Sequence, residues 1–334
     1  MSFIQIEQKS HVPKYKQVIE SIHEAIENKQ LKQNQKIPSI NEISQKFGLS
    51  RDTVMTAFNH LQSRGIIISK PGMGYYITKS TVNQKRKIFL LFDKLTPYKE
   101  TLFDSFRDEL KRQGTVEIFF HNFNAKTFET LISESIGHYT DYVIMPIPSK
   151  SVVSAIKKIP QDKLYILDRG RRLYGQTYPS VCQSFRKDTY NALASATELL
   201  KKYSKLVMLI PELSHVPTDL KRGFKEYCVE QNMPYDFTKK TNDTKIVKGN
   251  AYLVLDDNSL VSVVHQANQK SYILGKDVGI ISYNDTPLKS IVANGITTIS
   301  TDFAQMGKTL ADLIINRRKD HIENPSALII RASL

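Results

Sequence analysis

Residues 37–54, IPSINEISQKFGLSRDTV, contain the signals that decide the fold of the first domain. Ser39 and Glu42 stand in the S-x-x-E order of a capping box, so we expect a helix to begin at this point. Gly48 suits the left-handed residue that ends such a helix, and Ser50 can cap the next one. Two short helices joined by a tight glycine turn predict a helix-turn-helix.

The flanking residues add a third helix and a hairpin to this unit. From Pro13 to about Lys29, apolar residues recur at helical spacing, which predicts an amphipathic helix ahead of the helix-turn-helix. The helix that follows Ser50 is expected to run to about Arg64. Beyond it, two β-prone runs surround the turn PGMG at residues 71–74 and predict a β-hairpin. Together these features predict a winged helix.

Positive charge is concentrated in this first part of the chain. The 334 residues carry a net charge of +14, and residues 1–86 hold 13 Lys/Arg against 6 Asp/Glu, which is half of that excess. A basic end of this kind indicates a polyanionic partner, most often DNA. A charge that serves only solubility is the alternative. A short helix with a small polar outer face can enter a major groove.

Composition argues against several other classes of protein. The chain is 40% hydrophobic and 24% charged, as in globular proteins, and its length suits two or three domains. No apolar run reaches the roughly 18–20 residues of a membrane span, and the start lacks the order of a secretory signal. Cys182 and Cys228 are too few for a four-cysteine metal cage or a disulfide framework. We find no catalytic motif, and therefore expect a cytoplasmic protein that is no enzyme and holds no cofactor or metal.

Short motifs follow one another between Lys14 and Thr78 in a characteristic order and spacing. They are Tyr15-Lys16-Gln17-Val18, Ile37-Pro38-Ser39, Glu42-Ile43-Ser44, Phe47-Gly48-Leu49-Ser50-Arg51-Asp52-Thr53-Val54, Arg64-Gly65-Ile66-Ile67 and Gly72-Met73-Gly74. In these motifs the segment resembles the DNA-binding domain of the GntR family of bacterial transcription regulators. The resemblance implies a bacterial protein that binds a double-stranded DNA operator and is associated with the nucleoid.

The same resemblance implies DNA contacts from the second helix, the start of the third helix and the tip of the wing. Arg51 falls on a DNA-contacting arginine of the family, whereas Asn41 and Met55 stand where the family often has arginine. Met55 could touch a thymine methyl group or only pack. The expected DNA-contact residues are Ser39, Asn41, Arg51, Asp52, Thr53, Met55, Lys70, Gly72, Met73, Gly74 and Tyr75.

Beyond a polar, basic stretch, strand-like and helix-like segments alternate to the end of the chain. Strand-like runs include Ile88–Phe92, Tyr142–Ile147 and Val278–Tyr283, with amphipathic segments such as Asp188–Lys202 between them. This alternation predicts an α/β fold of parallel sheets with helices on both faces. About 250 residues suit two sheets, with a ligand cleft between the lobes at the carboxyl ends of the strands.

A second resemblance is strongest near the C-terminus, in DVGIISYNDTPL at residues 277–288 and ITTI at residues 296–299. Here the chain resembles the effector domain of LacI-type regulators, which is related to periplasmic sugar-binding proteins. A GntR-type head on such a body resembles the AraR-type arabinose repressors. The resemblance implies a homodimeric repressor of carbohydrate-utilisation genes, controlled by a monosaccharide or sugar phosphate.

These two resemblances set the expected domains. The expected boundaries are a winged helix-turn-helix DNA-binding domain at residues 1–79, a linker at 80–86 and an effector-binding domain at 87–334. Within the latter, lobe 1 is expected at about 87–184 and 302–320, and lobe 2 at about 185–301 and 321–334.

Polar side chains at the ends of predicted strands are candidates for the cleft. Asp168, Asp256 and Asn284 sit on family positions that touch effector hydroxyls, and carboxylates and amides suit that task. Tyr98 offers an aromatic face to a sugar ring. Each of the strand-end residues could instead cap the next helix. Leu220 stands where the family has an effector-binding arginine. The predicted effector-binding residues are Tyr98, Lys99, Asp168, Arg169, Asp256 and Asn284.

Two other readings of the body stay open at this point, both with an effector that is not a sugar. One is an enzyme-type body fused to a DNA-binding head, for which about 250 residues are short. The other is a carrier-type body, against which the complete winged helix argues.

Overall fold

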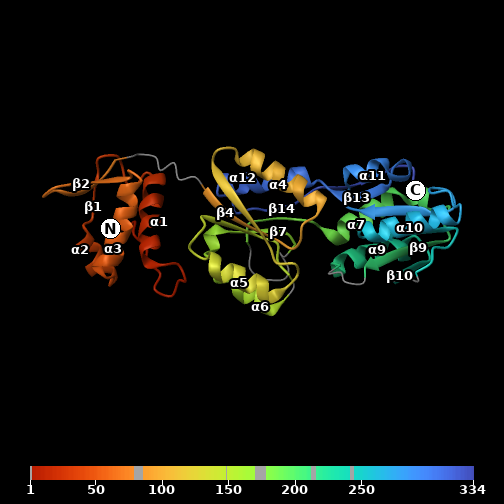
Figure 1. Ribbon diagram of the computed structural model, residues 1–334, viewed down its shortest axis with the longest axis horizontal. Coiled ribbons are helices and arrows are strands. Elements are labelled where there is room, and N and C mark those ends of the chain that lie inside the picture. Colours follow the sequence, from red (N-terminus) through yellow and green to blue (C-terminus); the bar gives the residue numbers. More distant parts are fainter. Residues whose placement is uncertain (1, 79–85, 148, 170–177, 212–215, 241–243) are drawn as a thin grey trace.

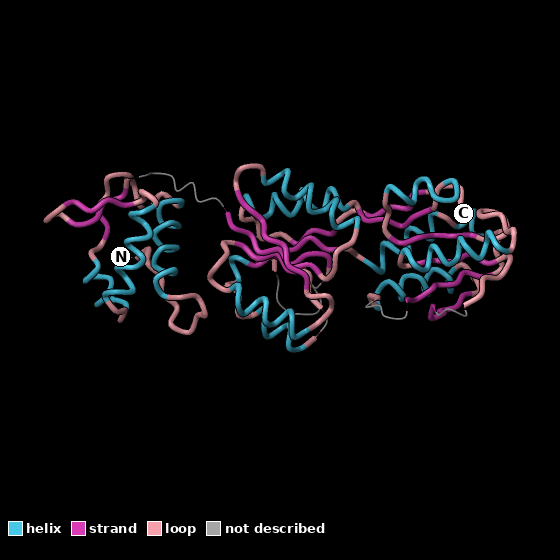
Figure 2. The backbone as a smooth tube through the Cα atoms, in the orientation of Figure 1, coloured by secondary structure: helices cyan, strands magenta, loops and turns pink. Residues whose placement is uncertain are grey.

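The computed structural model describes residues 2–78, 86–147, 149–169, 178–211, 216–240 and 244–334. Figures 1 and 2 show an N-terminal head followed by two α/β lobes in a row. The expected fold class, a winged helix-turn-helix joined to a body of two sheets with helices on their faces, is confirmed. None of the described helices is long and apolar enough to cross a membrane.

The head is a three-helix unit with a small antiparallel sheet in the order β1-β3-β2. Its core consists of side chains from all three helices, among them Val18, Ile43 and Phe58, each fully buried. Gly48, with φ +64°, makes the tight turn between the second and third helices. The elements are α1 (Lys14–Glu27), β1 (Lys36–Ile37), α2 (Ile40–Phe47), α3 (Arg51–Ser63), β2 (Ile67–Lys70) and β3 (Gly74–Ile77).

Lobe 1 has a parallel six-stranded sheet in the order β14-β8-β7-β6-β4-β5. Two apolar clusters cover its faces, and Figure 1 shows α4 and α12 on one face and α5 and α6 on the other. The strands are β4 (Arg86–Phe92), β5 (Gly114–Phe120), β6 (Asp141–Ile144), β7 (Leu164–Asp168), β8 (Ser180–Cys182) and β14 (His321–Glu323). The helices are α4 (Pro97–Leu110), α5 (Ala125–Ser135), α6 (Lys150–Ile156), η1 (Gln161–Lys163) and α12 (Phe303–Ile315).

Lobe 2 has a second six-stranded sheet, ordered β10-β9-β11-β12-β13-β15, in which only β15 runs antiparallel to its neighbour. The strands are β9 (Lys205–Pro211), β10 (Tyr235–Lys240), β11 (Asn250–Val254), β12 (Gly279–Tyr283), β13 (Thr297–Thr301) and β15 (Ser326–Ile329). The helices are α7 (Phe185–Ser195), α8 (Thr197–Leu200), α9 (Thr218–Glu230), α10 (Asp257–Gln269), α11 (Pro287–Ile291) and η2 (Val292–Asn294).

The chain passes between the lobes at β8 to α7, at β13 to α12 and at β14 to β15. The last crossing differs from the expected assignment of residues 321–334 to lobe 2. His321–Glu323 forms β14, which pairs with β8 in the sheet of lobe 1, and only the residues after it return to lobe 2. A three-residue strand carries too little pattern to reveal its partner, because its pairing is non-local.

Helices α7 and α9 approach closely at Gly223, which gives a test of the packing of lobe 2. A Cβ atom at Gly223 would lie 2.1 Å from the backbone oxygen of Arg186 in α7. Gly223→Ala should therefore destabilise the lobe by about 1–3 kcal/mol through overpacking, despite the roughly 1 kcal/mol helix advantage of alanine. Urea unfolding followed by circular dichroism measures the change.

Val229→Ala is the matched control, because Val229 is an exposed residue of the same helix. Its effect should stay within about 0.5 kcal/mol. A Gly223→Ala protein as stable as the parent would contradict the close contact of α7 with α9.

Candidate functional site

The start of α3 presents side chains to solvent. Arg51, Asp52 and Met55 lie on its exposed face, opposite the residues that pack into the head. Thr53 is committed to the helix cap, because its N–H donates to the Ser50 hydroxyl at 3.1 Å and the two hydroxyls are 2.8 Å apart. The exposed side chains at this helix start therefore come from Arg51, Asp52 and Met55.

Helix α2 begins with the capping box that its sequence predicts. The Ser39 N–H donates to Glu42 Oε2 at 2.7 Å, and the Glu42 N–H donates to Ser39 Oγ at 3.3 Å. The backbone N–H of Ser39, and then its hydroxyl, lower the pKa of the exposed Glu42 carboxyl by hydrogen bonding to it. Asn41 is exposed in the first turn of the helix. Asn41 is thus free to contact a ligand, whereas Ser39 already serves the cap.

The hairpin β2–β3 carries an exposed tip. Gly72 and Gly74 have φ values of +72° and +101°, which favour glycine, and the Met73 N–H donates to Lys70 O at 2.9 Å. Met73 is 55% exposed. The ring of Tyr75, another predicted DNA contact, packs edge-on against the buried Phe58, with 4.7 Å between the centroids.

Tyr76, the next residue of β3, lies on the face of the hairpin that points away from the core. The Lys70 ammonium lies 4.6 Å from the centroid of its ring, a cation–π contact. Adjacent residues of a strand point to opposite faces of the sheet, so only one of Tyr75 and Tyr76 can face the core. The sequence alone did not show which one.

At the carboxyl edge of the lobe 1 sheet, four charged side chains form a buried network. Lys99 in α4 is paired with Asp93, which follows β4. Arg169 lies 3.9 Å from Asp93 and 3.7 Å from Asp168. The structure thus brings together three of the predicted effector residues, Lys99, Asp168 and Arg169. Asp93 is a member that the sequence analysis missed.

Asp168 also connects this network, through Gln183, to two of the segments that cross between the lobes, β8 to α7 and β13 to α12. Gln183, just after β8, donates its Nε2–H to Asp168 Oδ1 at 2.5 Å and accepts from the Thr301 hydroxyl at 2.8 Å. Asp168 has φ +72°, a conformation that is unfavourable for a residue with a side chain. Burial raises the pKa of its carboxyl, and the charge of Arg169 opposes this shift.

Across from this network, lobe 2 holds buried polar groups with few partners among the described residues. Asn284 Oδ1 has none there, and the Tyr283 hydroxyl at the end of β12 has the Thr189 hydroxyl of α7 as its hydrogen-bond partner. Asp168 and Tyr98 of lobe 1 and Asp188 of lobe 2 all act on the pKa of Tyr283, so its hydroxyl lies among residues from both lobes. Burial raises that pKa, and the phenol remains a neutral donor.

Unpartnered polar groups in a protein interior are costly, and a bound ligand is one way to satisfy them. A hydroxyl donor, a second hydroxyl and an amide oxygen suit a small molecule rich in hydroxyl groups. The Asp188 carboxyl, whose pKa burial raises to about 6, lies close enough to influence Tyr283. Tyr283, Thr189 and Asp188 were missed by the sequence analysis, because strand and helix patterns mark such residues only as parts of a core.

The predicted effector residue Asp256 and the residue Leu220, which stands at the family's arginine position, have clear structural roles. The Asp256 carboxylate caps α10 by accepting from the Ser259 N–H at 2.6 Å, which is the alternative that its strand-end position left open. Leu220 is buried in the core of lobe 2. Lys289 fixes the loop around Asn284: its ammonium donates to Tyr283 O and Asn284 O and lies 3.1 Å from Asp257.

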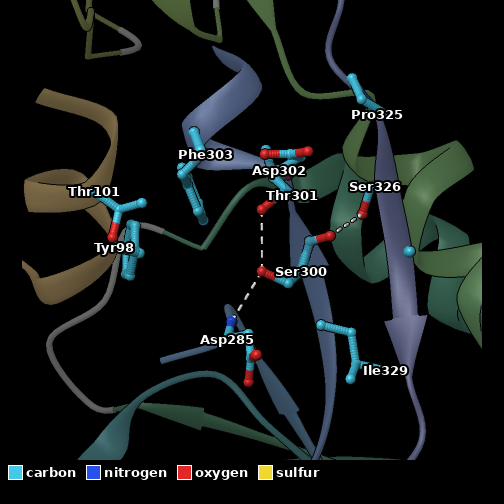
Figure 3. A pocket seen from close by; sticks show the side chains of 12 residues that line it. Tyr98, Thr101, Asp285, Ser300, Thr301, Asp302, Phe303, Pro325, Ser326 and Ile329 are labelled. Carbon is cyan, nitrogen blue, oxygen red and sulfur yellow. Dashed lines mark hydrogen bonds between the residues drawn. The ribbon is translucent and has the colours of Figure 1, made fainter. Parts of the chain in front are cut away.

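A cavity of about 440 Å³ lies between the lobes beside the crossings, a volume in the range of small-molecule sites. Figure 3 shows Tyr98 and Phe303 on its lobe 1 side and Asp285, Ser300 and Ile329 on its lobe 2 side. Tyr98, the one predicted effector residue in its lining, stacks on Phe303 with 4.7 Å between ring centroids. Asp285 is held by a bidentate pair with Arg331, both bonds measuring 2.8 Å.

Comparisons with known proteins divide the chain in the same way. Residues 14–77 match the model of the bacterial regulatory proteins of the gntR family, and residues 200–334 match that of the periplasmic binding protein-like domain. One similar solved structure is the lac repressor dimer bound to operator and the anti-inducer ONPF. It is 15% identical with a TM-score of 0.61, and the match covers 75% of this chain and 94% of that one.

Curated relatives match about a quarter of the chain. NagR of Bacillus subtilis, an HTH-type transcriptional repressor, is 32% identical over 79 residues, which are 24% of this chain and 32% of NagR. MngR of Escherichia coli, the mannosyl-D-glycerate transport/metabolism system repressor, is 34% identical over 94 residues, 28% of this chain and 37% of its own. The chain thus spans about a third or less of the first relatives it matches.

The repressor YtrA of Bacillus subtilis is matched over most of its length. The two are 32% identical over 99 residues, which are 30% of this chain and 72% of YtrA. With the family match at residues 14–77, this places the head among known regulators. The chain belongs to the GntR family of bacterial regulatory proteins, and a periplasmic binding protein-like domain follows its winged helix.

Proposed function

We propose that this protein is a homodimeric transcriptional repressor of carbohydrate-utilisation genes, acting in the bacterial cytoplasm. Its head binds a double-stranded DNA operator, and a sugar or sugar phosphate held between the lobes changes the strength of that binding. The observation that carries the proposal is the combination of an exposed recognition helix with a two-lobed body that has a cavity between its lobes and a buried amide oxygen, Asn284 Oδ1, without a partner among the described residues. An effector shifts the equilibrium only as far as its affinities for the two states differ.

The DNA-binding part rests on the head. Half of the net charge of +14 lies in residues 1–86, which favours salt-dependent attraction to phosphates. Arg51, Asn41 and Met55 supply exposed side chains for base and phosphate contacts. The wing adds Lys70 and the exposed backbone of Gly72 and its neighbours.

The carbohydrate part rests on the cleft and on one relative. Tyr283, Thr189 and Asn284 offer the mixture of donors and acceptors that sugar hydroxyls need. MngR is named as the repressor of a mannosyl-D-glycerate system, which favours a carbohydrate-related effector for this chain.

The homodimer is supported by an exposed apolar patch on lobe 2. Leu288 and Ile291 of α11 are 68% and 71% exposed, and Val292 next to them is 38% exposed. Large exposed apolar side chains that cluster in this way favour contact with another protein surface. The lac repressor, which has a similar body, is a dimer in its solved structure.

Arg51→Ala should raise the Kd for a duplex selected by the parent protein by about 10- to 100-fold, since a lost base or phosphate contact costs ~1–3 kcal/mol. The slope of log K against log salt should also fall by about one if the contact is to phosphate. Gel-shift titration at several salt concentrations measures both quantities. Arg64→Ala, at the other end of the helix, is the control. Equal losses in the two variants would argue against a specific role for Arg51.

Tyr283→Phe and Asn284→Ala should remove the response to effector. Tyr283→Phe deletes a hydroxyl bonded to Thr189, and Asn284→Ala places alanine at φ +62°, so each apoprotein should lose about 1 kcal/mol of stability or less. A thermal-shift screen of sugars and sugar phosphates finds the ligand, because binding to the folded state raises the midpoint. The variants are then tested with that ligand.

Tyr203→Phe is the matched control for this experiment. The Tyr203 hydroxyl is also buried without a partner among the described residues, but its ring lies near Gly279, at the opposite end of β12 from Tyr283. It should respond to the ligand normally. A normal response from Tyr283→Phe and Asn284→Ala as well would show that the effector binds elsewhere.

Ile291→Asp should convert the dimer into a monomer, because a carboxylate in the apolar patch would have to lose its hydration at the interface. Sedimentation equilibrium measures the change, with Ile273→Asp, another exposed isoleucine of lobe 2, as the control. A dimer that survives Ile291→Asp would place the subunit contact on another surface.

A further inference from the structure

Helix α1 of the head has two distinct faces. Its apolar side chains, such as Val18 and Ile22, are fully buried in the core of the head. At 100° per residue, Lys16, Glu20 and Glu27 fall within about 40° of one another on a different face. Packing in the head therefore accounts for the apolar face of α1 only. The polar face contacts lobe 1.

Two ion pairs join this polar face to lobe 1. Glu20 Oε1 lies 2.7 Å from the ammonium of Lys163 in η1, and Glu27 Oε2 lies 3.5 Å from Arg317. The Lys163 side chain is only 11% exposed, and Glu20 supplies its carboxylate. A lysine that is this deeply buried is costly without a counter-charge, so the pairing with Glu20 matters more than an exposed surface pair would.

Apolar and backbone contacts surround these pairs. Val12, just before α1, is 5% exposed and belongs to the same apolar cluster as Ile136 of lobe 1. The Lys16 ammonium donates to the backbone oxygen of Gly137. A Cβ atom at Gly137 would lie 3.0 Å from the ring of Pro13. The absence of a side chain at Gly137 therefore allows the head to pack closely against lobe 1.

The contact leaves the DNA-facing side of the head open. The apolar side of α3 shares the core with α1, whereas Arg51 and Met55 lie on the exposed side. Figure 1 shows α1 on the side of the head nearest lobe 1, with α2 and α3 beyond it. A head that is held through α1 therefore keeps its recognition helix available.

We propose that the face of lobe 1 formed by Gly137, Lys163 and Arg317 is a docking surface for the head of the same chain, and that the docked head is the arrangement that binds the operator. The second half of this proposal rests on the proposed function. Docking fixes the orientation of the head, so less freedom is lost when the protein binds DNA. It also makes α1 move with lobe 1, which gives an effector in the cleft a rigid connection to the recognition helix.

Distance measurements between spin labels test the docking directly. Cys182 and Cys228 are buried, so labels can be placed at Ser63→Cys in the head and Lys126→Cys in lobe 1, both of which are exposed positions. Labelled chains are diluted into an excess of unlabelled protein, so that only distances within one chain are read. The parent should give a narrow distribution, and Glu20→Lys and Lys163→Glu should each broaden it.

The charge-swapped double variant Glu20→Lys/Lys163→Glu should restore the narrow distribution, because it rebuilds the pair in reverse. Lys158→Glu makes the same change of charge at an exposed position of lobe 1 and should leave the distribution narrow. A broad distribution in the parent, unchanged single variants, or a double variant as broad as the singles would each overturn the docking surface.

Operator binding tests the second half of the proposal. Lys163→Glu should raise the Kd for the selected duplex about three- to tenfold relative to Lys158→Glu, since an undocked head loses more freedom on binding. Unchanged affinity in a Lys163→Glu protein with a broad label distribution would overturn the role of docking in DNA binding. A parent that binds no duplex would instead refute the proposed function, while the label distances would still report on docking.

Discussion

The amide of Gln183 connects the parts of the body that any movement between the lobes must disturb. It bonds to the carboxylate of Asp168 on one side and to the hydroxyl of Thr301 on the other, and so spans the end of β7 and two crossings. Asp168 is in turn close to Arg169 in a buried network of charges. Closure of the lobes has to preserve these bonds or exchange them for bonds to a ligand, since leaving the groups unpaired in the interior would be costly.

The two lobes differ in how well their buried polar groups are satisfied. On lobe 1, Lys99 and Arg169 already have carboxylate partners, so a ligand gains little by approaching them. On lobe 2, Asn284 Oδ1 is buried without a partner among the described residues, and the Tyr283 hydroxyl has only the Thr189 hydroxyl beside it as a hydrogen-bond partner. Under the proposed function, recognition of an effector would therefore depend mainly on lobe 2, whereas the charged groups of lobe 1 satisfy one another.

Local signals in the sequence were sufficient for the head. The capping box of Ser39 and Glu42 and the left-handed Gly48 act within a few residues, and the structure contains both. The strands of the body were also predictable as apolar runs, because parallel strands buried on both faces have continuous apolar sequences. The short strand β14 was not assigned to its sheet, since only its distant pairing with β8 defines it.

The candidate site between the lobes was also predictable only in part, because some of its residues are defined by contacts that are distant in the sequence. Charged residues at strand ends, such as Lys99 and Asp168, are conspicuous in a sequence, and the structure brings them together. Asp256 had the same appearance but serves α10 as its cap. Gln183 and Tyr283 could not be identified from the sequence, because their importance comes from partners that they find, or lack, only after the lobes assemble.

The polar stripe on α1 has a consequence for how such regulators can be recombined. If the head were merely tethered, it could be exchanged freely among bodies that sense different compounds. Glu20 and Glu27 match Lys163 and Arg317 on this particular lobe, so a transplanted head would need a compatible set of charges on its new host. Builders of chimeric biosensors would then have to graft the η1 segment and its neighbours together with the winged helix.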